Sequence, residues 1–144
     1  FNISPGCPNL IERIEGGLLS YGNEMTRDNN PLEIGLGKYC SLDGSIDYIG
    51  RKALENIAQN GPDRKVYGVL FDTPSCPTCS TPWLVKHNEV VVGKITSGIY
   101  SPRLERNIGM ALVEHGYWTA GLEVSVTLPD GQIRKGQLSN LPFG

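Results

Sequence analysis

The second half of the chain consists of six short apolar segments separated by turn-forming residues, and this pattern constrains the possible folds most strongly. The segments are residues 65–71, 83–86, 90–96, 108–113, 122–128 and 132–138. In the fifth segment Val124, Val126 and Leu128 alternate with polar neighbours, as in a half-buried strand. Pro129-Asp130-Gly131 joins the last two segments and predicts a hairpin turn. Six strands at this spacing predict a small antiparallel barrel or sandwich.

The chain divides at Asn60-Gly61-Pro62-Asp63, a run of turn formers that predicts a boundary between residues 1–62 and residues 63–144. Upstream of it, residues 10–15 fit a helix and a strand equally well, and the polar residues 22–31 predict a loop. The expected fold class is therefore α+β, with a β-rich unit after a segment of helices and loops.

Residues 49–59 carry the clearest helical pattern in the chain. The apolar positions that share one face are Ile49, Ala53, Leu54 and Ile57. Asp47 lies just ahead, where it can cap the helix or favour its N-terminus, and Asn60-Gly61-Pro62 ends the helix. A shorter helix is expected over residues 32–36, after Pro31.

Charge and hydropathy exclude several classes of partner. The 13 basic and 15 acidic residues give a net charge of −2, and no run of Lys and Arg is long enough to neutralise a nucleic-acid backbone. No stretch approaches the roughly 18 consecutive apolar residues of a membrane span, and the N-terminus lacks the layout of a signal peptide. We therefore expect a soluble cytoplasmic protein, and because Phe1 starts the chain without a Met, we expect a piece of a longer one.

Cys76-Pro77-Thr78-Cys79 is the one short motif that suggests a metal or redox site. A closed zinc site needs four ligands, and the other thiols, Cys7 and Cys40, are distant in sequence and have no paired spacing. The surrounding prolines predict a loop between strands rather than the helix N-terminus that lowers a thiol pKa. We expect a loop without metal, with a disulfide, redox or metal role as the alternatives.

No residue receives a catalytic role from its local pattern. His87 adjoins the predicted turn Asn88-Glu89, and His115 precedes Gly116, so both histidines are expected in turns or on the surface. The chain contains neither a Gly-x-Gly-x-x-Gly motif nor a phosphate-binding loop. The residues alone therefore predict an α+β fragment but no reaction.

Three segments, in order along the chain, resemble the C-terminal half of the glycine-cleavage T-protein family. They are residues 12–37, with Arg13-Ile14-Glu15, Tyr21-Gly22 and Pro31-Leu32-Glu33-Ile34-Gly35-Leu36, residues 47–54, with Ile49-Gly50-Arg51, and residues 92–113, with Thr96-Ser97-Gly98 and Asn107-Ile108-Gly109. Leu141-Pro142-Phe143 is similar to the family's terminal proline-phenylalanine. The resemblance implies three domains around a folate channel, with the end of the folate-binding α/β region in residues 1–62 and a six-stranded antiparallel β-barrel in residues 63–144.

The resemblance also implies that the cofactor is tetrahydrofolate. Glu15 matches the acidic residue that accepts hydrogen bonds from the pterin, and a carboxylate offers two adjacent acceptors to such a planar pair of donors. Tyr21 matches an aromatic residue at the folate channel, and Arg64 a basic residue that can pair with the folate's carboxylate tail. The family's catalytic aspartate lies in the N-terminal half, so we expect no catalytic residue here and no activity of this chain alone.

Residues 4–15 look closest to the dimethylsulfoniopropionate demethylase branch, which moves a methyl group from a sulfonium to tetrahydrofolate. The proline-rich residues 73–82 also differ from ordinary T-proteins. The alternatives are a glycine-cleavage aminomethyltransferase, a folate domain of a dimethylglycine- or sarcosine-oxidising enzyme, and a non-catalytic folate-binding or regulatory relative. The expected partners are a small one-carbon donor and the N-terminal half of the polypeptide, and a lipoyl carrier protein for an aminomethyltransferase.

Overall fold

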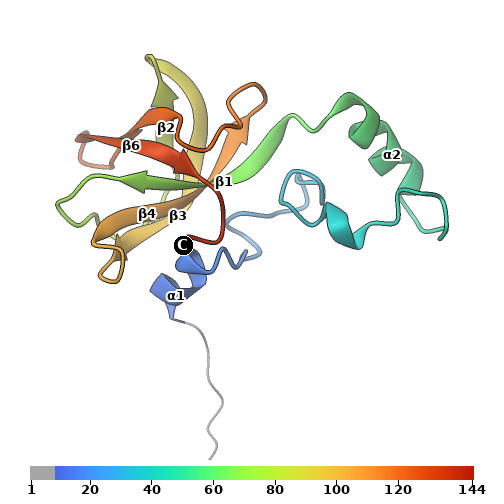
Figure 1. Cartoon of the computed structure of the whole chain (residues 1–144), viewed down its shortest axis with the longest axis horizontal. Coiled ribbons are helices and arrows are strands. Elements are labelled where there is room, and N and C mark those ends of the chain that lie inside the picture. Colours follow the sequence, from blue (N-terminus) through green and yellow to red (C-terminus); the bar gives the residue numbers. More distant parts are fainter. Residues whose placement is uncertain (1–8) are drawn as a thin grey trace, which may run out of the picture.

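A closed barrel of six antiparallel strands forms the larger part of the computed structural model, which describes residues 9–144 (Figure 1). The strands are β1 (Arg64–Phe71), β2 (Trp83–His87), β3 (Val90–Ser101), β4 (Arg106–Glu114), β5 (Glu123–Thr127) and β6 (Ile133–Ser139). Their order around the barrel is β1-β4-β3-β2-β5-β6. The six predicted strands are confirmed. Because the sheet closes on itself, the fold is the barrel and not the sandwich.

Strand β4 is buried on both faces, from Asn107 to Val113, because it separates two apolar clusters. Ala111 and Val113 belong to the core inside the barrel, together with Phe71 and Trp83. The alternate residues of β4 face outward and join a second cluster. Its buried members are Ile14, Ile108, Met110 and Phe143. The outer face of β4 therefore provides the surface on which the N-terminal segment packs.

The sequence pattern did not predict two details of the barrel. Strand β3 extends five residues past the predicted end at Thr96, because pairing with β4 resumes after a β-bulge and continues to Ser101 opposite Arg106. Gly136 of β6 lies so close to β1 that a Cβ atom there would stand 2.4 Å from the Leu70 carbonyl oxygen. The β1–β6 closure consequently requires a residue without a side chain at this position.

Residues 10–15 form helix α1 (Leu10–Glu15), which resolves the helix-or-strand alternative. Asn9 and Glu12 make a reciprocal capping box, in which each side chain accepts a hydrogen bond from the other residue's backbone N–H. This box and the burial of Ile14 against β4 stabilise a helix that is too short to persist alone.

Helix α2 (Arg51–Asn60) begins two residues later than predicted, and the predicted cap is wrong. Gly50 is the N-cap residue in a left-handed conformation, with φ of 90°, and no side chain caps the helix. Asp47 instead forms an ion pair with Arg51 at 3.5 Å.

The helix predicted over residues 32–36 is also wrong, because these residues form turns. The Asn30 side chain accepts hydrogen bonds from the backbone N–H groups of Leu32 and Glu33, which holds the chain in a turn. A 3-10 helix, η1 (Gly37–Tyr39), follows.

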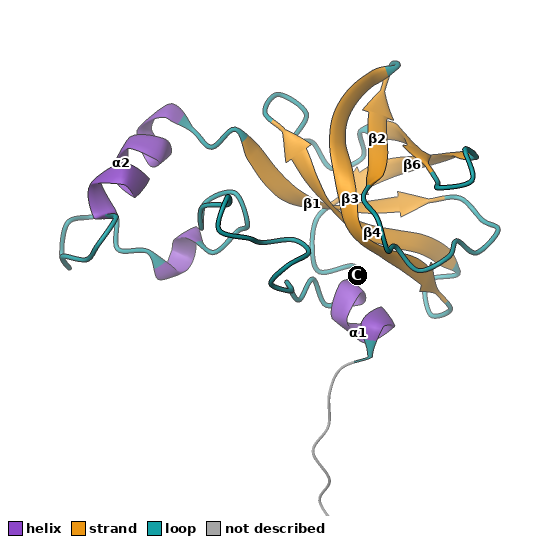
Figure 2. Ribbon diagram, turned by 180° about the vertical axis from the view of Figure 1, so that it is seen from behind, coloured by secondary structure: helices purple, strands orange, loops and turns teal. Residues whose placement is uncertain are grey.

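The segment from the end of α1 to α2 leaves the barrel as an arm, with α2 at its far end (Figure 2). Helix α2 has no buried residue. Within the described residues, no helix has the length and apolar character needed to cross a membrane. The division at residue 62 agrees with the start of β1 at Arg64, and the proposed domain boundary stays a prediction.

Candidate functional site

Glu15 is the last residue of α1, and two residues at the end of β3 and in the turn after it hold its side chain. Ser101 Oγ donates to Glu15 Oε1 at 2.5 Å, and Arg103 Nε donates to Oε2 at 2.6 Å. The hydrogen bond from Ser101 and the charge and hydrogen bond of Arg103 lower the pKa of Glu15, although burial opposes this shift. The carboxylate thus stays ionised while 13% of the side chain remains exposed.

A second carboxylate, Glu24, anchors the loop that carries Tyr21. Its side chain is 1% exposed and accepts hydrogen bonds from Arg13 Nη1 at 2.9 Å, from the Ser20 N–H at 2.8 Å and from Thr96 Oγ1 at 3.3 Å. Arg13 lies two residues before Glu15 on α1. One buried ion pair therefore ties the helix, the loop after it and strand β3 together.

Arg13 extends this network further. It donates to the Leu18 carbonyl at 2.7 Å and, through Nη2, to Ser97 Oγ at 2.6 Å. Helix α1 is accordingly attached to β3 through Ser97 as well as through the Ser101 contact of Glu15.

Tyr21 presents its ring to solvent, with 68% of the residue exposed. Its backbone forms an isolated bridge with Met25, and the Gly22 N–H donates to the Met25 carbonyl at 2.8 Å. The ring is thus displayed on a hydrogen-bonded loop, where a flat ligand can stack on it.

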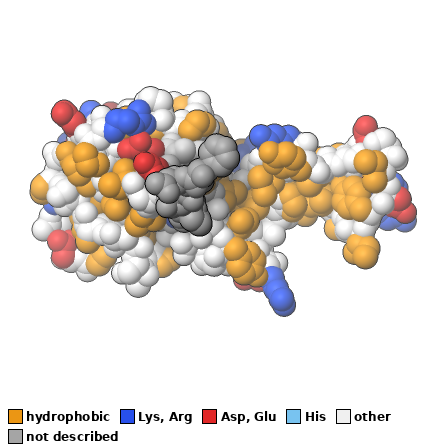
Figure 3. All heavy atoms as spheres, turned by 90° about the horizontal axis from the view of Figure 1, so that it is seen from below, with side chains coloured by type: hydrophobic (Ala, Val, Ile, Leu, Met, Phe, Trp, Pro, Cys, Tyr) orange, Lys and Arg blue, Asp and Glu red, His pale blue; other side chains and the backbone are white. Residues whose placement is uncertain are grey.

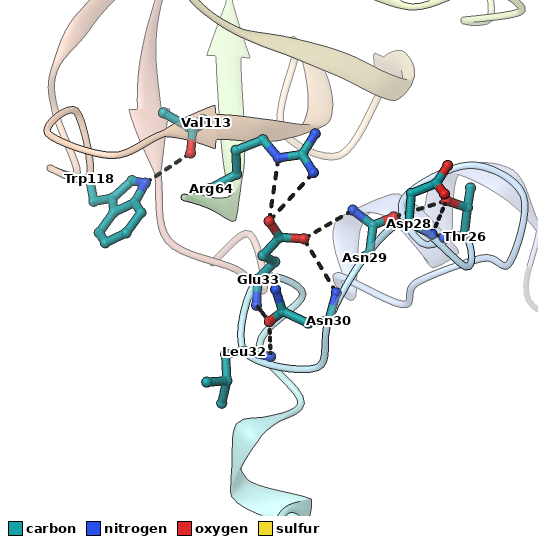
Figure 4. A network of polar contacts seen from close by, with 9 residues as sticks. All are labelled: Thr26, Asp28, Asn29, Asn30, Leu32, Glu33, Arg64, Val113 and Trp118. Atoms are coloured by element: carbon teal, nitrogen blue, oxygen red, sulfur yellow. Dashed lines mark hydrogen bonds and ion pairs between the residues drawn. The ribbon is translucent and has the colours of Figure 1, made fainter. Parts of the chain in front are cut away.

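Arg64 does not lie beside Glu15. It pairs with the buried Glu33 at 3.4 Å, and Glu33 also accepts hydrogen bonds from Asn29 and Asn30 (Figure 4). In the sheet Arg64 stands opposite Glu114 at one end of β4, whereas Ser101, the partner of Glu15, stands opposite Arg106 at the other end. The structure therefore groups Glu15 with the Tyr21 loop and separates Arg64 from them.

An open cavity of about 750 Å³ lies between the N-terminal segment and the barrel, and neither Glu15 nor Tyr21 is among its lining residues. Its walls come from residues 16–19, Met25, residues 34–36, 38–39 and 65–67, and the C-terminal residues 140–142. They are largely apolar and include Tyr39, Lys38 and Lys65. A partly aromatic, partly charged organic molecule suits such a surface.

The Cys-x-x-Cys pair lies in the loop between β1 and β2, as predicted. Burial is the main cause that raises the pKa of both Cys76 and Cys79 to about 11, so both remain thiols at neutral pH. The described residues hold no group of three or more potential metal ligands. The absence of a metal or redox role stays a prediction.

Several residues that build this site carried no signal in the sequence. Ser101 and Arg103 are more than 80 residues from Glu15, so no local pattern relates them. Glu24 and Glu33 are acidic residues in a polar loop, where an exposed position is the default expectation. The residues 4–8 that resemble the demethylase branch lie outside the described part of the chain.

Residues 64–143 match the family model for the glycine cleavage T-protein C-terminal barrel domain, which covers more than half of the chain. The chain belongs to the glycine cleavage T-protein family. The matched range runs from Arg64, the first residue of β1, to Phe143, which packs beneath α1. The T-protein resemblance predicted from the three sequence segments is thereby confirmed.

Two curated relatives have different activities. The chain is 42% identical over 130 residues to the dimethylsulfoniopropionate demethylase DmdA of Ruegeria pomeroyi, covering 90% of this chain and 35% of that protein. It is 38% identical over 131 residues to the aminomethyltransferase of Symbiobacterium thermophilum, covering 91% of this chain and 34% of that one. The chain thus spans about a third of the length of these relatives.

The fold is similar to a solved T-protein as well. The crystal structure of the glycine cleavage system aminomethyltransferase T from Bartonella henselae superposes with a TM-score of 0.80 at 26% sequence identity. The match covers 92% of this chain and 37% of that one, so it extends well beyond the barrel domain of residues 64–143.

Proposed function

We propose that this chain is the C-terminal part of a longer tetrahydrofolate-dependent transferase that moves a methyl group from a small onium donor to the cofactor. The observation that carries the choice of donor is the 42% identity to a dimethylsulfoniopropionate demethylase. A sulfonium is permanently cationic, and aromatic faces attract such a cation. A small soluble donor of this kind does not need a lipoyl carrier protein.

The geometry around Glu15 supports the folate part of the proposal. Its ionised carboxylate stands at the end of α1 and is 13% exposed, so it can accept hydrogen bonds from the pterin's amino and ring N–H groups. Tyr21 offers an exposed ring on the following loop. Arg64 uses only part of its guanidinium on Glu33, so its other N–H groups can bind the folate's carboxylate tail.

The upstream part of the same polypeptide is the proposed partner of the arm. Large apolar side chains that remain exposed include Leu18, Tyr21, Tyr39, Ile46 and Ile49. Figure 3 shows hydrophobic side chains along the narrow part of the molecule that carries the arm. An apolar surface of this kind marks an interaction site, and the curated relatives are about three times as long as this chain.

A glycine-cleavage aminomethyltransferase is the second candidate. It is supported by the 38% identity to the Symbiobacterium thermophilum protein and by the structural match to the Bartonella henselae enzyme. Both candidates place tetrahydrofolate at Glu15, and they differ in the donor of the one-carbon unit.

Glu15→Gln tests the folate assignment in the longer polypeptide. The variant loses a charge-assisted hydrogen bond worth about 1.5 to 3 kcal/mol, so tetrahydrofolate affinity should fall roughly tenfold to a hundredfold in an anaerobic titration. The free energy of unfolding should change little, because Arg103 is 57% exposed and ion pairs with exposed partners contribute little. Unchanged folate affinity would show that Glu15 has a structural role only.

A further inference from the structure

We propose that the segment after β6, residues 140–143, is a spacer that fixes the distance between the turn after α1 and strand β1, with Leu141 and Phe143 as its positioning residues. This closing segment would thereby set the shape of the cavity between the N-terminal segment and the barrel. The inference rests on the proposed function, because it takes the cavity as part of the surface that binds tetrahydrofolate. Leu141-Pro142-Phe143 is similar to a terminal motif of the family, but the resemblance gave it no role.

Phe143 anchors the closing segment beneath α1. Its side chain is 5% exposed and packs in one apolar cluster with Ile14 of α1 and with two residues of β4. The Phe143 N–H donates to the Glu15 carbonyl at 2.9 Å, and the Phe143 carbonyl accepts from Arg103 Nη2 at 3.4 Å. The end of the chain accordingly lies beside α1 (Figure 1). Phe143 therefore connects the helix to the outer face of the barrel by packing and by hydrogen bonds.

Two glycines make room for the closing segment, one in the turn after α1 and one in β1. A Cβ atom at Gly68 of β1 would stand 2.7 Å from the Phe143 ring and 3.2 Å from Leu141 Cδ2. A Cβ atom at Gly17, in the turn, would stand 3.2 Å from Leu141 Cβ. Leu141 thus contacts both the turn and the strand, and its size sets their separation.

The parts that Leu141 separates are also walls of the cavity. Residues 16–19 of the turn, residues 65–67 around Gly68's end of β1 and residues 140–142 of the closing segment all line it. Close-packed surroundings relax only partly when a side chain is shortened, so a smaller residue at position 141 should leave these walls less well defined. A cavity that keeps its shape before the ligand arrives loses less entropy on binding.

Helix α1 has a second attachment to the barrel that does not involve the closing segment. Arg13 Nη2 donates to Ser97 Oγ of β3 at 2.6 Å, and the side chain of Glu15 accepts from Ser101 Oγ at the end of the same strand. A change in the closing segment should consequently alter the cavity without detaching the helix.

The test is steady-state kinetics of the longer polypeptide, with the donor that supports turnover, for wild type, Leu141→Ala, Phe143→Ala and Leu141→Met. Leu141→Ala and Phe143→Ala should raise the KM for tetrahydrofolate roughly twofold to tenfold, the cost of ordering about one side chain on binding. The kcat at saturating folate should stay at its wild-type value, because only binding is lost. Leu141→Met conserves volume and should restore the wild-type KM.

Leu84→Ala is the matched control, since it truncates an apolar side chain that is 46% exposed on β2, and its KM should equal that of wild type. Partial misfolding lowers the amount of active enzyme and leaves KM unchanged, so KM separates positioning from folding. A wild-type KM in both Leu141→Ala and Phe143→Ala would overturn the spacer role alone. A wild-type polypeptide that does not bind tetrahydrofolate would instead overturn the proposed function.

Discussion

At the scale of single residues, the buried Arg13–Glu24 ion pair is the contact that holds the loop carrying Tyr21. Glu24 is 1% exposed and joins α1, the Tyr21 loop and β3. Replacing one member of a buried pair is costly, because the remaining charge stays in a poorly solvated place. The pair therefore holds the loop that carries Tyr21 in place.

Glu24→Gln should destabilise the chain by about 3 kcal/mol, since it leaves the Arg13 guanidinium without its counter-charge. Urea unfolding measures the change. Glu89→Gln is the matched control, because Glu89 pairs with Lys86 at 3.7 Å but has an 88% exposed side chain, and it should cost less than about 1 kcal/mol. Equal effects of the two substitutions would contradict the role given to Glu24.

At the scale of elements, the local sequence pattern predicted the strands whose residues alternate between apolar and polar. It did not predict features that depend on residues far away in the chain. The alternation of Val124, Val126 and Leu128 and the hairpin turn were enough for β5 and β6, because both depend on neighbouring residues. The end of β3 at Ser101 depends on pairing with β4 beyond a bulge. The folate-binding role of Glu15 was predicted from the family resemblance, because the spacing of apolar residues carries no information about ligand contacts.

The β1–β2 loop shows the same dependence on a distant residue. Asn107, 0% exposed on β4, donates to the carbonyls of Asp72 and Pro74 and accepts from the Cys76 N–H at 2.8 Å. The sequence around residues 72–82 predicted a loop, but it held no sign of the side chain that organises it.

Asn107→Ala should destabilise the chain by about 3 kcal/mol, because the buried Cys76 N–H and two partly buried carbonyls lose their partner. Amide hydrogen exchange should increase at Cys76 in particular. Asn140→Ala, at an exposed position after β6, provides the control and should change unfolding by less than about 0.5 kcal/mol. Unaltered exchange at Cys76 in Asn107→Ala would argue against this organisation of the loop.

At the scale of the whole molecule, the barrel completes its own core, whereas the arm leaves apolar side chains uncovered. Glu15 lies at the junction of the two, on a helix attached to the barrel and followed by the Tyr21 loop. The barrel thus holds Glu15, the candidate folate-binding residue, from one side. The proposed upstream part of the polypeptide would supply the catalytic aspartate and the rest of the channel.

The most direct test of this account supplies the longer polypeptide with tetrahydrofolate and either dimethylsulfoniopropionate or an aminomethyl-loaded lipoyl protein, and identifies the folate product. Transfer from a small onium donor forms 5-methyltetrahydrofolate, whereas the glycine-cleavage reaction forms 5,10-methylenetetrahydrofolate. We expect 5-methyltetrahydrofolate with dimethylsulfoniopropionate, without any carrier protein and not from the 144-residue chain alone. Methylene product formed only with the lipoyl protein would contradict the proposed donor and leave the aminomethyltransferase function in its place.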